Sequence, residues 1–111
     1  MHSAENMLKE YLDYLEIEKN RSVRTRENYE RYLNTFFARA RVKNIADITE
    51  TAVRDFRLGL ARRGTASGET LKKNTQSYYA IAIRNFLKYL VKRGIPALPP
   101  DRSAFRYWHA T

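Results

Sequence analysis

The 111-residue sequence contains no cysteine, which excludes a disulfide framework and cysteine-ligated zinc sites. Only four glycines and three prolines are present, and none of the glycines forms a phosphate-binding loop motif. The two histidines, His2 and His109, lie at opposite ends, and neither has a partner at the spacing of metal ligands or of a catalytic base. We therefore expect no metal, no cofactor and no catalytic residues in this chain.

Long hydrophobic runs are also lacking. No segment approaches the roughly 20 apolar residues that cross a bilayer. Lys9, Glu10, Asp13 and Glu16 interrupt the first residues, so a signal peptide is not expected either. Hydrophobic residues still make up 43% of the chain, which is enough for one folded core. These features predict a single soluble domain with a cytoplasmic location and no membrane partner.

Positive charge dominates the composition, with a formal net charge of +9. Residues 1–20 carry two lysines and five acids, a balance of −3, whereas residues 21–111 carry nineteen Lys and Arg and seven acids, a balance of +12. Such an asymmetry favours a polyanionic partner on one side of the molecule. The alternative is a solvated basic surface that serves only solubility.

Hydrophobic residues recur at helical spacing in the first half of the chain. A first helix is expected over about residues 4–19. Ser22 is the expected N-cap of a second helix, because a serine hydroxyl can accept a bond from the amides of the first turn. The apolar stripes of the two helices contain Leu8, Tyr11, Leu12, Leu15, Tyr29, Tyr32, Leu33, Phe36, Phe37 and Ala40.

Two further helices are expected in the second half. Thr49 is the expected N-cap of the third, with Ile48 and Val53 as a hydrophobic staple, and this helix should end at residues 62–64. The fourth runs over about residues 74–92 and should end before Gly94. Residues 65–70 have no periodicity and are expected to form a loop. Because no strand-like alternation persists, the predicted fold is an all-α, compact bundle of four or five helices.

Two of the expected helices begin with cations and short hydrogen-bonding side chains. Helix amino ends suit phosphate groups, because their backbone N–H groups lack partners and the helix dipole is positive there. We expect the two first turns to lie side by side and to form one cationic shelf for a DNA duplex. Helix capping is an alternative role for the threonines and asparagine, and it is compatible with phosphate contact. The residues concerned are Arg21, Arg24 and Thr25 in one turn, and Lys72, Lys73, Asn74 and Thr75 in the other.

The outward faces of the same two helices carry further candidates for DNA contact. Ile81 is an apolar residue among polar ones, and it could touch a thymine methyl group in a major groove. Packing against a neighbouring helix is the equally open alternative. The expected outward residues are Arg24, Glu27, Asn28, Arg31 and Thr35 on the second helix, and Ser77, Tyr78, Ile81, Arg84, Asn85 and Lys88 on the fourth.

In order and character, these motifs resemble the amino-terminal core-binding domain of tyrosine recombinases, the phage-integrase and Xer-like family. The resemblance covers about residues 5–96 and is carried by SVRTRENYERYLNTFF, ITETAVRDFRLGLARRG and NTQSYYAIAIRNFLKYLVKRGIP. It implies a SAM-like bundle that forms half of a C-shaped clamp, with its second and fourth helices facing the major groove. By position it implies contacts from Arg24, Thr25, Glu27, Asn28, Lys73, Asn74, Thr75, Ser77, Tyr78 and Ile81.

The family cuts DNA with a carboxyl-terminal domain whose His-x-x-Arg motif and nucleophilic tyrosine do not occur before Thr111. The resemblance therefore implies a core-binding domain over residues 1–96 and a linker over residues 97–111, in a chain that is not itself an enzyme. The implied partners are double-stranded DNA, the catalytic domain of the same bacterial, archaeal or phage-encoded parent, and neighbouring protomers. The alternative function is a helical protein–protein interaction module, suggested by the acidic first helix and by Tyr107 and Trp108.

Overall fold

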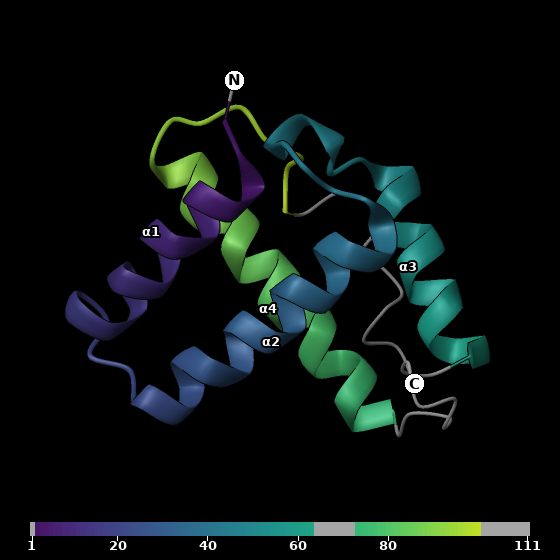
Figure 1. The fold of residues 1–111 in the computed structure, drawn as a ribbon, viewed down its shortest axis with the longest axis horizontal. Coiled ribbons are helices and arrows are strands. Elements are labelled where there is room, and N and C mark those ends of the chain that lie inside the picture. The colour runs from purple at the N-terminus through teal and green to yellow at the C-terminus, as the bar shows by residue number, and fades with distance from the viewer. Residues whose placement is uncertain (1, 64–72, 101–111) are drawn as a thin grey trace.

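The computed structural model describes residues 2–63 and 73–100, and for residues 63, 73 and 74 it describes only the helical backbone. The loop expected at residues 65–70 and the tail around Trp108 lie outside these ranges. The described residues contain no strand, which confirms the all-α fold class, and none of their helices is long and apolar enough to cross a membrane. The elements are α1 (Ala4–Ile17), α2 (Val23–Ala40), the 3-10 turn η1 (Ile45–Asp47), α3 (Glu50–Arg63) and α4 (Lys73–Lys92) (Figure 1).

Three helices begin at a hydroxyl residue that caps the first turn. The Ser22 Oγ atom accepts a hydrogen bond from the Thr25 amide at 3.1 Å, and Thr49 Oγ1 accepts one from the Ala52 amide at 3.1 Å. Both caps were expected from the sequence and are confirmed. Ser3 caps α1 in the same way. A cap of this kind typically stabilises a protein by about 1 kcal/mol.

The end of α1 differs slightly from the expectation. This helix ends at Ile17, two residues before the expected Lys19. Asn20 adopts the left-handed conformation with φ of 51°, and the Arg21 amide then bonds the Leu15 carbonyl at 2.9 Å. Asparagine tolerates this conformation better than most residues, so the chain turns back sharply toward α2.

The core lies where α2 and α4 cross, at the centre of the view in Figure 1. Phe36 and Phe86 are fully buried there. The Phe86 ring contacts Tyr11 of α1 with a centroid separation of 5.5 Å. Phe56 of α3 lies 5.0 Å from Phe36 and 5.6 Å from Tyr79 of α4. Aromatic contacts therefore join all four helices.

A short 3-10 turn between α2 and α3 was not expected. Asp47 Oδ2 accepts hydrogen bonds from the backbone amides of Asn44 and Lys43, at 2.9 and 3.0 Å. These bonds favour the charged carboxylate and hold the pKa of Asp47 below its usual value. The amino end of the chain joins the same turn, because the Ala4 amide bonds the Lys43 carbonyl and the Ile45 amide bonds the His2 carbonyl, both at 2.9 Å.

The segment after α4 folds back onto the bundle. Gly94 has a φ of +75°, and the following Ile95 amide bonds the Leu90 carbonyl at 2.9 Å, which completes the expected helix end. Beyond it, Ala97 and Leu98 are half-buried and pack against the core. These two residues, at the start of the predicted linker, thus contact the bundle, and the domain boundary at residue 96 stays a prediction.

Candidate nucleic-acid interface

The faces of α2 and α4 adjoin along one side of the bundle. The Tyr32 and Tyr79 rings lie 4.7 Å apart, and the Asn85 Nδ2 atom donates a hydrogen bond to the Tyr29 hydroxyl at 3.3 Å. These two contacts help to fix how the two helices cross. Side chains on their outward faces therefore keep defined positions relative to one another.

The two first turns do not lie side by side. In Figure 1 the first turn of α2 is at the lower left of the molecule, whereas that of α4 is at the lower right. Thr25, in the first turn of α2, lines a cavity together with Asn85 and Lys88 from the second half of α4. The expectation of one shelf built from two adjacent first turns is therefore wrong. The surface between them is formed by the crossing helices themselves.

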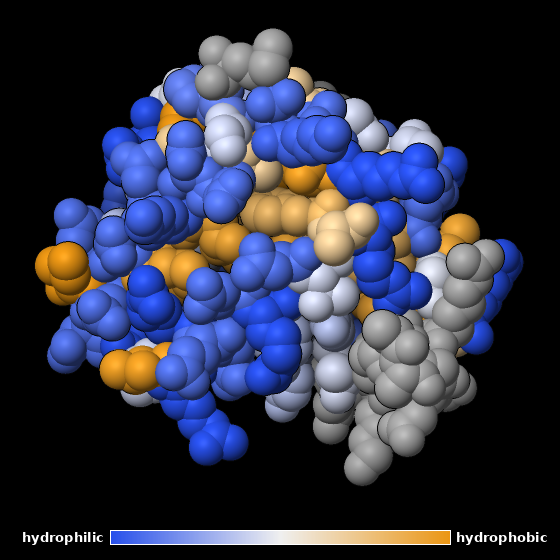
Figure 2. Space-filling model, in the orientation of Figure 1, coloured by the Kyte–Doolittle hydropathy of each residue, from blue (hydrophilic) through white to orange (hydrophobic). Residues whose placement is uncertain are grey.

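On α2, the residues predicted to contact DNA are placed at the surface. Arg24, Glu27 and Arg31 are exposed, and Thr25 and Asn28 are half-buried. The Arg31 guanidinium lies 5.1 Å from the centroid of the adjacent tyrosine ring, an arrangement that favours a cation. The side chain of Arg21, just before the helix, is also exposed. Figure 2 shows that hydrophilic residues cover most of the visible surface over this helix.

On α4, Tyr78 is 51% exposed and Ile81 is 37% exposed. The exposure of Ile81 keeps the proposed contact with a methyl group open, since this residue is not enclosed by a neighbouring helix. Arg84 is half-buried, and its Nε atom has no hydrogen-bond partner in the described structure. Thr75 and Ser77 are half-buried near the amino end. Among the other predicted residues, Lys72 lies outside the described residues, and only the backbone is described for Lys73 and Asn74.

Acidic residues of α1 form ion pairs with two basic residues, Arg26 and Arg93. Arg26 of α2 lies 3.8 Å from carboxylate oxygens of both Asp13 and Glu16. Arg93, after α4, lies 3.7 Å from a carboxylate oxygen of Glu10. The negative balance of the first 20 residues is thus partly matched within the fold. Arg26 is consequently held toward α1, whereas the next residue, Glu27, is exposed.

Lys19 and Lys92, which were not among the predicted residues, join this surface together with Lys88, which was predicted only as an outward residue of α4. Lys19 from the end of α1, and Lys88 and Lys92 from α4, line the same cavity as Thr25 and Arg21. Helical spacing places Asn85, Lys88 and Lys92 on one stripe of α4, and this pattern is visible in the sequence. The approach of Lys19 depends on how the α1–α2 connection turns, which the sequence pattern does not reveal.

Comparison with known proteins assigns the chain to a family. A family model described as "Phage integrase, N-terminal SAM-like domain" matches residues 8–94, which span most of α1 and all of α2, α3 and α4. The chain belongs to this family. The protein is similar to tyrosine recombinase XerC of Bacillus subtilis (strain 168), with 34% identity over 92 residues.

The match between this SAM-like domain and XerC covers 83% of the present chain and 29% of XerC, so the chain spans less than a third of that relative's length. No solved structure matches the chain. The resemblance to the amino-terminal domain of tyrosine recombinases, first suggested by the residue motifs, is thereby confirmed. Which residues of the SAM-like domain touch DNA stays a prediction.

Proposed function

We propose that this domain binds duplex DNA as the core-binding half of a tyrosine site-specific recombinase and is non-catalytic by itself. Membership of the family supports a role in site-specific recombination. The observation that carries the DNA-binding part is the paired surface of α2 and α4. Exposed arginines and lysines there flank short hydrogen-bonding side chains, which is the combination that phosphates and base edges require.

The proposed contacts divide into two kinds. Arg24 and Arg31 are exposed on α2 and lie where they can neutralise phosphates, which supplies affinity without sequence preference. Asn28, Tyr78 and Ile81 have uncharged side chains, which are suited to the base edges of a major groove. Because the Tyr29–Asn85 hydrogen bond and the Tyr32–Tyr79 ring contact join α2 to α4, both sets of contacts would approach the duplex as one unit.

The location of the interface is testable by titrating the isotopically labelled domain with a duplex and following its amide NMR resonances. Shifts concentrated in α2 and α4 are expected, with α3 serving as the internal reference. The expected dissociation constant is about micromolar to sub-millimolar, the range of non-specific DNA binding at physiological salt. Shifts confined to α1 and α3 would place the interface elsewhere and contradict the proposal.

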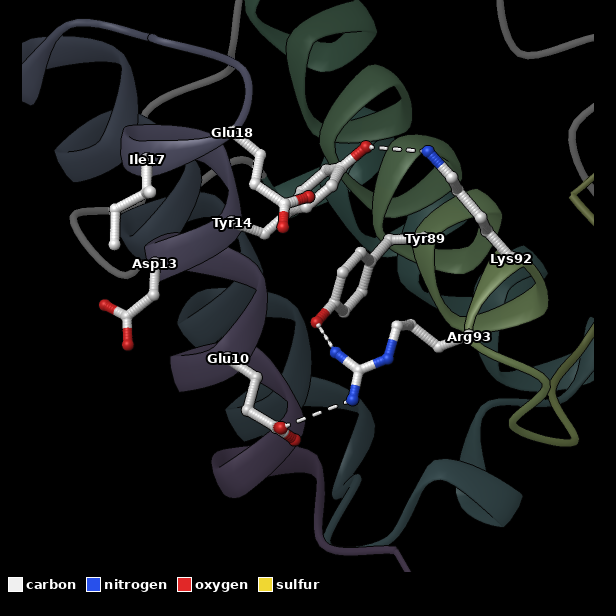
Figure 3. Close-up of a pocket in the computed structure, with 8 residues that line it drawn as sticks. All are labelled: Glu10, Asp13, Tyr14, Ile17, Glu18, Tyr89, Lys92 and Arg93. Carbon is white, nitrogen blue, oxygen red and sulfur yellow. Dashed lines mark hydrogen bonds and ion pairs between the residues drawn. The ribbon is translucent and has the colours of Figure 1, made fainter.

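We further propose that the DNA-bound domain acts with the catalytic domain of its parent protein and with neighbouring protomers. A groove of about 540 Å³ between α1 and α4 supports a protein contact (Figure 3). Ile17, which is 75% exposed, lies in it beside three acids (Glu10, Asp13 and Glu18) and two cations, Lys92 and Arg93. An exposed apolar residue among charges of both signs suits a protein surface better than DNA.

This groove also favours the alternative function, a protein-interaction module without a nucleic-acid role. Sedimentation of the domain with and without duplex DNA distinguishes the proposed function from this alternative. If neighbouring protomers meet on DNA, Ile17→Asp reduces the larger DNA-bound species and leaves the affinity of a single domain for DNA unchanged. Self-association of equal extent without DNA, together with no DNA binding, would favour the alternative.

A further inference from the structure

The cavity beside the first turn of α2 has an unusual charge. It measures about 420 Å³ and is formed by the end of α1, the α1–α2 connection, the start of α2 and the second half of α4. Among the described residues that line it, none is an aspartate or a glutamate. Four of them are cations, namely Lys19, Arg21, Lys88 and Lys92.

Two of the cations are held against the same aromatic ring. The Lys19 Nζ atom lies 5.9 Å from the Tyr14 ring centroid, and the Lys92 Nζ atom lies 5.6 Å from it. Lys92 Nζ also donates a hydrogen bond to the Tyr14 hydroxyl at 3.5 Å. Attraction to the ring keeps these like charges near one another despite their repulsion. An anion bound among them would remove that repulsion, so the arrangement favours anion binding.

The nearby carboxylates line the neighbouring groove between α1 and α4, and not this cavity. Tyr14, Tyr89 and Lys92 line both this cavity and the acidic groove between α1 and α4. Figure 3 shows Glu10 on the groove side, joined to Arg93 rather than to a cation of the cavity. The carboxylates therefore line the groove only, whereas Lys92 lines both the groove and the cavity.

Polar groups of the cavity supplement the cations. The Tyr29 hydroxyl accepts the hydrogen bond from Asn85, so its own hydrogen remains to be donated. The Thr25 hydroxyl, which lies 3.0 Å from Ser22 Oγ, is at the positive end of the α2 dipole, and this end of a helix favours oxyanions. Several donors converging with four cations match the charge and the acceptor oxygens of a phosphate group.

We propose that this cavity binds a phosphate group through Lys19, Arg21, Lys88 and Lys92. The phosphate belongs either to the DNA backbone, in which case the inference rests on the proposed DNA-binding function, or to a free phosphate ester. If it holds a DNA phosphate, the site extends the DNA-contact surface from the start of α2 to the end of α1. Lys19 and Lys92 were not among the residues predicted from sequence, and Lys88 was predicted only as an outward residue of α4.

The first test uses the unmodified domain and inorganic pyrophosphate as the probe. Amide NMR spectra are compared between pyrophosphate and sodium chloride at equal ionic strength and pH. The amides of Lys19, Arg21, Thr25 and Lys88 are expected to shift with pyrophosphate only. Equal shifts in the two salts would overturn the inference of a specific phosphate site.

The second test compares two charge-matched double variants in duplex binding. Lys19→Gln with Lys88→Gln removes two cavity cations, whereas the control, Lys9→Gln with Lys43→Gln, removes two exposed lysines that do not line the cavity. If the cavity holds a DNA phosphate, the first variant loses about tenfold in affinity at about 50 mM salt relative to the control, and its log–log salt slope falls by about 0.9.

The outcomes distinguish this inference from the proposed function. Pyrophosphate-specific shifts with equal DNA affinity in both variants would assign the cavity to a free phosphate ester and support the inference. If pyrophosphate causes specific shifts but the domain does not bind DNA, the inference of a phosphate site is supported and the proposed DNA-binding function is contradicted. DNA binding by the unmodified domain, combined with equal affinities of the variants and no specific shifts, would overturn the inference alone.

Discussion

Asn85 and Tyr29 are 56 residues apart in sequence and are joined by a hydrogen bond of 3.3 Å between the Asn85 Nδ2 atom and the Tyr29 hydroxyl. The bond connects α4 to α2, and both residues line the cavity beside the first turn of α2. Both side chains are half-buried, so water competes for this bond less than on an open surface. The pair therefore helps to fix the crossing of the two helices.

Tyr29→Phe and Asn85→Ala should be coupled in a double-mutant cycle. Each substitution alone is expected to lower the free energy of unfolding by about 0.5–1.5 kcal/mol, the usual net contribution of one hydrogen bond. The double variant should lose less than the sum, because the second substitution has no bond left to remove. Urea unfolding measures all four proteins. Additive losses would show that this bond does not contribute.

Arg24→Ala should weaken binding to every duplex to a similar extent. Loss of one phosphate contact corresponds to about a tenfold drop in affinity at about 50 mM salt. Lys73→Ala should act in the same direction. Arg54→Ala on α3 is the matched control, because this arginine is exposed and lies outside the proposed surface. An equal loss in the Arg54 variant would indicate a non-local charge effect.

Asn28→Ala should change sequence preference rather than affinity in general. A side-chain amide that reads a base edge contributes about 1–3 kcal/mol of discrimination against the wrong base, whereas phosphate contacts contribute none. Competition binding with a randomised duplex pool, sequenced before and after selection, measures the preference. An unchanged preference profile would remove Asn28 from the base-reading residues.

Two glycine substitutions should have opposite effects on stability. Gly94→Ala is expected to cost about 1 kcal/mol, because Gly94 has a φ of +75° where an L side chain is strained. Gly59→Ala should stabilise by up to about 1 kcal/mol, because Gly59 lies inside α3 and its added Cβ atom would meet only the end of the Arg39 side chain at 3.7 Å. Thermal and urea unfolding compare both variants with the unmodified domain, and equal signs would contradict the assigned backbone conformations.

The hydrogen bonds to Asp47 predict a pH dependence of stability. Backbone N–H groups of Asn44 and Lys43 lower the pKa of this carboxyl in the folded state. The contribution of Asp47 is therefore fully present above the ordinary aspartate pKa of about 4 and is lost as the pH falls through the folded value. Asp47→Asn should reduce stability at pH 7, and its difference from the unmodified domain should shrink below about pH 4. A difference that is constant with pH would contradict this role.

Local features were the ones most accurately predicted from sequence. Ser22 and Thr49 cap their helices as expected, and Gly94 follows the last one, because caps and helix ends depend on a few adjacent residues. The 3-10 turn was missed because it depends on Asp47 reaching back to two backbone amides, a pattern shared with many ordinary loops.

The relative placement of the helices could not be obtained in this way. The positions of the first turns follow from how Tyr32 packs against Tyr79 and how the aromatic core fills, which are contacts between distant parts of the chain. For the same reason Lys19 and Lys88 were not recognised as neighbours. The outward faces of α2 and α4 were correctly identified as exposed or half-buried wherever their side chains are described, since helical periodicity alone determines them.

The most direct test of DNA binding through the α2–α4 surface is the salt dependence of duplex affinity, measured for the unmodified domain and for Arg24→Ala from about 50 to 200 mM salt. The logarithm of the association constant should fall linearly with the logarithm of salt concentration, with a slope of several units that decreases by about 0.9 in the variant. An affinity that does not change with salt, or a slope identical in both proteins, would contradict the account.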